Sequence, residues 1–129
     1  MVAKKVFRRI FKFHGLPESF TLAFKGILYL FLYHRNMRLI FLLGFAAFLL
    51  GLGFQLSGIE LVALCITITL VFVAEIFNTA IEMLMDMLKV KYHIRIKLVK
   101  DIAAAVVLLT SLNAIAVGYI LFVRRLFAR

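Results

Sequence analysis

The sequence predicts an all-α membrane protein with three transmembrane helices and an N-terminal amphipathic surface helix. Hydrophobic residues make up 65% of the 129 residues, and the mean hydropathy is +1.08. About half of an ordinary soluble domain is apolar, so this chain is too apolar to be one. A chain of this length leaves no room for a separate soluble catalytic domain. We therefore expect any active site to be built from the membrane helices and their ends.

The first part of the chain, residues 1–33, is expected to form basic and amphipathic interfacial helices on the cytoplasmic side. In residues 2–13, apolar and basic residues alternate at helical spacing, which is typical of a helix lying on a membrane surface. Gly15 and Pro17 separate this segment from a second helix that begins near Glu18. Lys25, near the middle of that apolar helix, favours a position in or near the interface rather than across the membrane.

Residues 34–129 are predicted to form a three-span membrane domain, with spans at about 38–57, 59–88 and 99–123. A span needs roughly 20 mainly apolar residues. The first apolar run is short for this purpose, but it suffices if flanking side chains reach the interface or the bilayer thins. The other two runs are long enough without such adjustment.

The formal net charge of +10 is distributed unevenly along the chain. Most Lys and Arg residues precede the first span or lie in the loop 89–100, none lies between the first two spans, and Arg124, Arg125 and Arg129 follow the third. The positive-inside rule therefore places the N-terminus and loop 89–100 in the cytoplasm of a multi-pass protein of the cell membrane. Because the basic residues flank apolar runs, we expect anionic lipid headgroups or anionic substrates as partners, and no nucleic acid.

The second span carries acidic and amide side chains on one face. At about 100° per residue, Glu75, Asn78, Glu82 and Asp86 fall within roughly 80° of one another. If Glu60 lies at one membrane face, Glu75 lies roughly 22 Å along the helix, just inside the opposite boundary. A carboxylate at that depth is costly unless it is paired, neutralised or bound to a cation, so this polar stripe indicates a functional site.

The stripe alone leaves three interpretations open. A carboxylate at the apolar boundary could accept the proton of a lipid hydroxyl while a second one holds a divalent cation, as phosphoryl transfer requires. The stripe could also be a proton or ion relay, or a hydrogen-bonded seam between subunits. The glycines of the chain fit neither a P-loop nor a kinase glycine-rich loop.

The segment Glu75-Ile-Phe-Asn78-Thr79-Ala80-Ile81-Glu82, followed by Asp86, His93 and Lys100-Asp101, closely resembles the signature of the prokaryotic membrane diacylglycerol kinase and undecaprenol kinase family. The resemblance covers about residues 19–123. It implies a homotrimer of three-span subunits with shared sites. It also implies transfer of the ATP γ-phosphoryl group to a lipid hydroxyl with Mg²⁺.

The resemblance also implies roles for individual residues. Glu75 is expected to be the general base and Glu82 a metal ligand that also contacts ATP, with Asn78 and Asp86 supporting the site. The expected ATP-binding residues are Lys91, Tyr92, His93, Lys100 and Asp101. The expected lipid-binding residues are Phe20, Phe24, Gly26 and Asn36.

One position departs from the family pattern. The segment before the first span reads His34-Arg35-Asn36-Met37-Arg38, and His34 replaces a Glu that the family uses as a second metal ligand. Mg²⁺ prefers oxygen ligands, whereas imidazole suits other divalent metals better. We therefore expect an ATP-dependent lipid kinase acting on diacylglycerol or undecaprenol. The alternatives are a changed metal preference, or a catalytically weak or inactive member that serves as a membrane scaffold or ion carrier.

Overall fold

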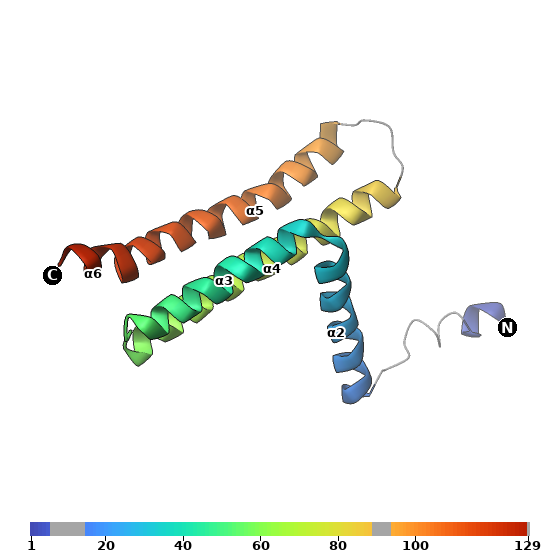
Figure 1. Cartoon of the computed structure of the whole chain (residues 1–129). Coiled ribbons are helices and arrows are strands. Elements are labelled where there is room, and N and C mark those ends of the chain that lie inside the picture. Colours follow the sequence, from blue (N-terminus) through green and yellow to red (C-terminus); the bar gives the residue numbers. More distant parts are fainter. Residues whose placement is uncertain (6–14, 89–93, 129) are drawn as a thin grey trace. The chain divides into compact units, whose positions relative to one another are not determined.

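The computed structural model describes residues 1–5, 15–88 and 94–128, and regular structure within these ranges is helical without any strand. The helices are α2 (Leu16–Tyr33), α3 (Arg35–Gly53), α4 (Gly58–Met87), α5 (Ile94–Gly118), the π-helical turn η1 (Tyr119–Val123) and α6 (Arg124–Phe127) (Figure 1). The prediction of an all-α protein is confirmed. Most of the predicted amphipathic segment 2–13 lies outside the described residues.

The chain divides into two units, residues 1–34 and 35–129. In the first unit, α2 begins after Gly15 with Pro17 in its first turn, where the missing N–H of proline has no helical partner to lose. Glu18 in the same turn complements the positive end of the helix dipole. None of the side chains of α2 is buried. It is thus an exposed helix with a strongly apolar surface.

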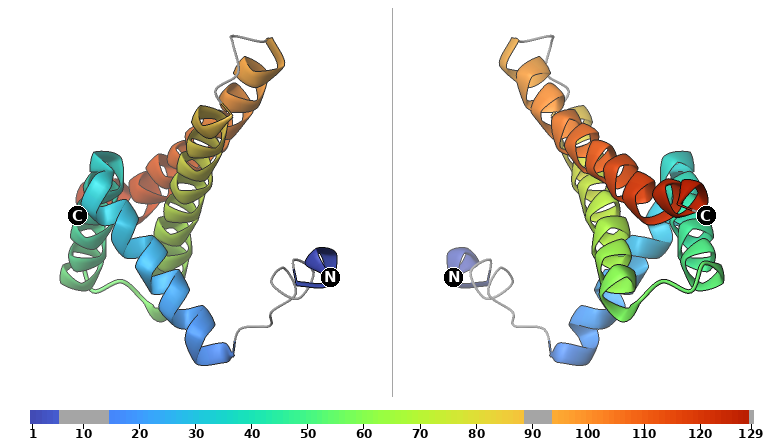
Figure 2. Two further views of the ribbon diagram at one scale, coloured as in Figure 1. Left: turned by 90° about the vertical axis from the view of Figure 1, so that its right-hand side faces the viewer. Right: turned by 90° about the vertical axis from the view of Figure 1, so that its left-hand side faces the viewer.

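The second unit is built around α4, which packs against both α3 and α5. The three helices alternate in direction, and α5 continues through η1 into α6 as one rod (Figures 1 and 2). The 30 residues of α4 correspond to about 45 Å at 1.5 Å per residue, longer than the hydrocarbon core of a bilayer. One end of α4 therefore extends into the interfacial region when the helix spans a membrane.

Two glycines allow α3 to approach α4 closely. A Cβ added at Gly44 would lie 2.8 Å from Cγ2 of Ile68, and one added at Gly51 would lie 2.9 Å from Cδ2 of Leu64. Real Cβ atoms do not come this close to other heavy atoms, so each glycine leaves space for a side chain of α4. Small residues serve this purpose widely between membrane helices, where backbones must approach for van der Waals packing.

The turn between α3 and α4 is fixed by local hydrogen bonds. Ser57 caps α4 by accepting a hydrogen bond from the Glu60 N–H at 3.3 Å. Gln55 adopts a left-handed backbone with φ 55°, which reverses the chain. Beside this turn, Leu56, Leu64 and Leu121 form a buried apolar cluster that joins the turn, α4 and η1. The α3–α4 turn and the C-terminal end of the chain are thereby held together.

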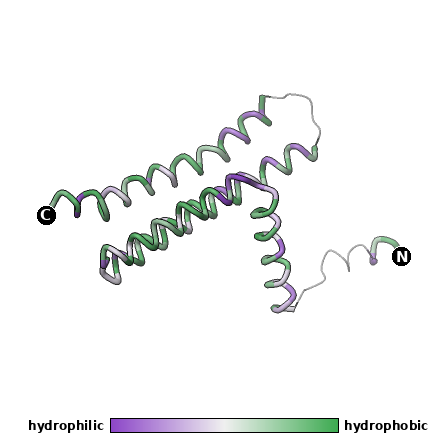
Figure 3. Tube along the Cα trace, in the orientation of Figure 1, coloured by the Kyte–Doolittle hydropathy of each residue, from purple (hydrophilic) through white to green (hydrophobic). Residues whose placement is uncertain are grey.

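Three helices are long and apolar enough to cross a membrane: Arg35–Gly53, Gly58–Met87 and Ile94–Phe127. Apolar residues cover their middles, and hydrophilic residues gather where α4 ends and α5 begins (Figure 3). Many large apolar side chains along them are exposed in the single chain. Such surfaces are stable against lipid tails or neighbouring membrane helices and unfavourable in water.

Candidate functional site

Glu75, on α4 of the second unit, is buried. Only 7% of its surface is exposed, and its neighbours Ala74 and Thr79 on α4 are also buried. Glu75 lies near the middle of the 30-residue helix, where the backbone is rigid because its hydrogen bonds are satisfied within the helix. A carboxylate so placed faces protein rather than lipid tails. This arrangement is compatible with the proton-accepting role expected for it.

One turn further along α4, an amide and a carboxylate are linked. Asn78 Nδ2 donates a hydrogen bond to Glu82 Oε1 at 3.4 Å, as their spacing of four residues allows. The other amide atom, Asn78 Oδ1, is buried without a hydrogen-bond partner among the described residues. Glu82 itself is exposed. The pair thus offers an exposed carboxylate beside a buried oxygen that lacks a donor or cation.

Asp86 connects the end of α4 to α5. Lys100 Nζ lies 3.5 Å from Asp86 Oδ1, and the side chains are 44% and 75% exposed, respectively. An ion pair this exposed contributes at most about 1 kcal/mol to stability because water screens both charges. The lysine therefore remains able to exchange its partner for another anion.

A second ion pair lies within the first two turns of α5. Lys97 Nζ approaches Asp101 Oδ2 to 3.7 Å, at the i,i+4 spacing of a helix. Both side chains are about 60% exposed. The structure therefore places Asp86, Lys97, Lys100 and Asp101 at the same end of the second unit, each outside the buried helix packing.

The remaining predicted site residues belong to the first unit, to the start of α3 or to the part of the chain that the structure does not describe. His34 ends α2 in the first unit, with its ring 6.1 Å from that of Tyr29, and its backbone N–H donates to the carbonyl of Leu30. Phe20 and Phe24 on α2 are exposed, and a Cβ at Gly26 would meet open space. Asn36 is exposed in the first turn of α3. Lys91, Tyr92 and His93 lie outside the described residues.

The donor atoms of this region suit a magnesium ion. No group of three or more His, Cys, Asp or Glu side chains within the described ranges could hold a metal ion alone. Mg²⁺, however, is commonly held by one or two carboxylates together with water and substrate phosphates. Glu82 and the unsatisfied oxygen of Asn78 are donors of the type it prefers, so the residues present fit Mg²⁺ bound with a nucleotide.

Sequence reasoning missed an ion pair at the opposite end of α4. Arg125 Nη2 lies 2.9 Å from Glu60 Oε2 and donates to Glu60 Oε1 at 3.2 Å, while Nη1 donates to the carbonyl oxygen of Phe54 at 3.1 Å. One arginine thus joins α6, the first turn of α4 and the end of α3. The separation of 65 residues between the partners gives no local sequence signal. The i,i+4 spacing of Lys97 and Asp101, by contrast, could have been read from the sequence.

Residues 21–122 match the model of a family described as prokaryotic diacylglycerol kinase. Among curated proteins, the chain is 35% identical over 105 residues to a diacylglycerol kinase of Synechocystis sp.. That alignment covers 81% of this chain and 60% of the relative, so this chain spans well under the whole length of the Synechocystis protein. The chain is also 30% identical over 109 residues to an undecaprenol kinase of Bacillus subtilis, covering 84% of this chain and 89% of the relative.

Proposed function

Because the chain belongs to the prokaryotic diacylglycerol kinase family, we propose that it is a multi-pass membrane enzyme that phosphorylates a lipid hydroxyl with ATP. Diacylglycerol and undecaprenol are the two candidate substrates, in line with the names of the two relatives. Each offers a primary hydroxyl on a long apolar tail. The observation that carries the proposal is the buried Glu75 on the same helix as the Asn78–Glu82 pair.

In the proposed reaction, the lipid hydroxyl oxygen attacks the γ-phosphorus of ATP. A new P–O bond forms to the lipid, the bond from the γ-phosphorus to the β,γ-bridging oxygen breaks, and ADP leaves. Glu75 takes the hydroxyl proton as general base. Its burial on a rigid helix fixes it in place and limits the access of competing water.

Polar groups at the cytoplasmic end of α4 and α5 are proposed to hold the nucleotide. Glu82 and Asn78 would hold Mg²⁺, which when bound neutralises charge on the phosphate oxygens. The Lys100–Asp86 ion pair is weak because both side chains are exposed. Lys100 would therefore loosen its contact with Asp86 and donate hydrogen bonds to phosphate. The proposed orientation places the N-terminus and the loop 89–100 in the cytoplasm, where ATP is available.

The active form is proposed to be a homotrimer with shared sites. The described part of one chain contains no complete metal-binding group, and its long helices expose many large apolar side chains. A neighbouring subunit could bury these faces and supply further ligands. Cross-linking of the purified protein in detergent, resolved by mass, would count the subunits. A monomeric protein with full activity would contradict this part of the proposal.

One experiment decides both substrate and activity. The purified protein is incubated in mixed micelles with Mg²⁺ and γ-labelled ATP, with either diacylglycerol or undecaprenol, and labelled lipid is counted. We expect phosphate transfer to at least one of the two lipids. Transfer to neither would favour the alternative of a weak or inactive family member that acts as a scaffold or ion carrier. The replacement of the family Glu by His34 is the observation that favours this alternative.

A further inference from the structure

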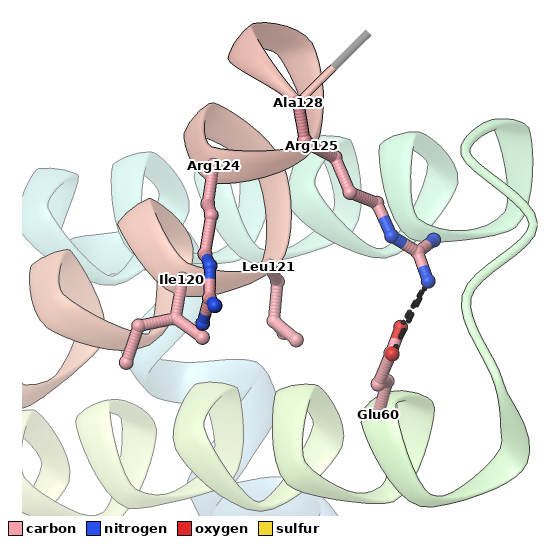
Figure 4. A pocket seen from close by; sticks show the side chains of 6 residues that line it. All are labelled: Glu60, Ile120, Leu121, Arg124, Arg125 and Ala128. Carbon is pink, nitrogen blue, oxygen red and sulfur yellow. Dashed lines mark hydrogen bonds and ion pairs between the residues drawn. The ribbon is translucent and has the colours of Figure 1, made fainter.

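A cavity lies at the end of the second unit that is remote from Glu82. It has a volume of about 310 Å³ and is lined by Glu60, Ile120, Leu121, Arg124, Arg125 and Ala128 (Figure 4). This volume is at the lower end of the range found for small-ligand sites. The cavity forms where the first turn of α4 meets η1 and α6, and it shares no lining residue with the proposed kinase site.

One wall of this cavity is fixed and electrically neutral. The guanidinium group of Arg125 is engaged by the Glu60 carboxylate and by the Phe54 carbonyl oxygen. Glu60 is the single carboxylate among the lining residues, and its charge is balanced by that of Arg125. A charge-assisted pair of this kind holds both side chains in position. The ligand-binding capacity of the cavity therefore depends on its other arginine.

Among the described lining residues, Arg124 carries a positive charge that no carboxylate balances. Its side chain points from α6 toward α4 and lies alongside Ile120 and Leu121 (Figure 4). Within the part of the chain that the structure describes, no ion pair or hydrogen bond engages its guanidinium group. The planar guanidinium group matches the geometry of phosphate oxygens and can bind two of them at once.

The surroundings of Arg124 favour an amphiphilic anion over a soluble one. Ile120 and Leu121 give the cavity an apolar side next to the arginine, and Leu121 belongs to the buried apolar cluster. The cavity lies where the apolar helices reach their ends, at the level of lipid headgroups in a bilayer. Free phosphate would leave the apolar side without a partner, whereas the upper part of a lipid chain would contact it.

We propose that this cavity binds the phosphate of a phospholipid headgroup through Arg124, with Ile120 and Leu121 in contact with the beginning of the lipid chains. The Arg125–Glu60 pair acts as a wall and does not bind the phosphate. The site is independent of the kinase site, because the two lie at opposite ends of α4 and have no residue in common.

The test uses the 129-residue chain purified in detergent, with phosphatidylglycerol added and bound lipids counted by native mass spectrometry. We expect Arg124→Gln to weaken phosphatidylglycerol binding by about tenfold or more, the order expected for the loss of hydrogen bonds to a charged group. Arg124→Lys should retain part of the affinity, because it keeps the charge but not the planar fork. Lys97→Gln, which removes a positive charge that Asp101 already balances at the other end of the second unit, is the control and should bind as the wild type does.

A second variant tests the cavity without changing its charge. Ala128→Phe should fill the space and weaken lipid binding while Arg124 is retained. Equal binding by the wild type, Arg124→Gln and Ala128→Phe would overturn the proposal. So would complete displacement of the lipid by inorganic phosphate, because that result would identify the ligand as a soluble anion. Glu75→Gln should bind phosphatidylglycerol normally even if it is inactive, which separates this proposal from the proposed kinase function.

Discussion

The ammonium group of Lys100 on α5 lies 3.5 Å from the carboxylate of Asp86 on α4. This pair bridges the two helices at the end where α4 stops and α5 starts. Because its side chains are 44% and 75% exposed, water screens the pair and its contribution to stability is small. If Lys100 binds nucleotide, we expect its effect on nucleotide binding to exceed its effect on folding.

Replacing Lys100 by Gln tests this expectation. We predict an increase of about tenfold in the KM for ATP, since a charge-assisted contact to phosphate is lost. The melting temperature in detergent should change little. Lys97→Gln, one turn earlier and also in an exposed ion pair, is the control and should raise the KM less. A fall in melting temperature that parallels the loss of activity would assign Lys100 a structural role instead.

The ion pair between Glu60 and Arg125 should stabilise the opposite end of the unit. In a double-mutant cycle with Glu60→Gln and Arg125→Gln, we predict a coupling free energy of about 1 kcal/mol, because the pair is only partly buried. Arg125→Gln should cost more than Glu60→Gln, since it also leaves the Phe54 carbonyl oxygen without its donor. Unfolding in mixed detergent measures both free energies. If the losses in the free energy of unfolding caused by the two single substitutions simply added up in the double variant, the two side chains would not interact.

The close approach of α3 and α4 predicts a contrast between two glycines. Gly44→Ala should destabilise the protein because the new Cβ would meet Ile68, whose branched side chain cannot easily move aside. A Cβ at Gly118 would meet open space, so Gly118→Ala should be neutral or stabilise by up to about 1 kcal/mol through helix propensity. Equal effects of the two substitutions on the free energy of unfolding would contradict this packing.

The three long helices could be predicted from the sequence because their signals are local. Uninterrupted apolar runs identify the spans, and Gly15 and Pro17 mark the start of α2. The helical periodicity of the second span likewise places Glu75, Asn78 and Glu82 on one face of α4. The contact between Asn78 and Glu82 follows from their spacing alone.

Contacts between distant segments could not be predicted in this way. The Arg125–Glu60 pair depends on how α6 packs against the start of α4. No local sequence pattern indicates this packing, because it results from the arrangement of all three long helices. The π-helical turn at Tyr119–Val123 has no simple residue signature either, because its sequence is as apolar as an ordinary membrane helix. The burial of Glu75 also depends on helix packing, since a helical face can meet protein, water or lipid.

Replacing His34 by Glu should increase the rate of phosphate transfer. His34→Glu should raise the rate with Mg²⁺ if the missing oxygen ligand limits turnover, because Mg²⁺ prefers carboxylate to imidazole. His34→Gln is the control, because it supplies a neutral amide oxygen without the negative charge of a carboxylate. Rates measured with Mg²⁺ and with Mn²⁺ would reveal any change in metal preference. An unchanged or lower rate for His34→Glu would remove this explanation of the departure from the family pattern.

The most direct test of the proposed function is the phosphate-transfer rate of Glu75→Gln, measured together with its assembly. We predict a loss of at least about 100-fold in the rate, as expected for removal of a general base, with cross-linked assembly and melting temperature unchanged. Glu60→Gln, the same substitution on the same helix, should lower stability but preserve the rate. Full activity of Glu75→Gln, or collapse of its assembly together with its activity, would contradict the catalytic role of Glu75.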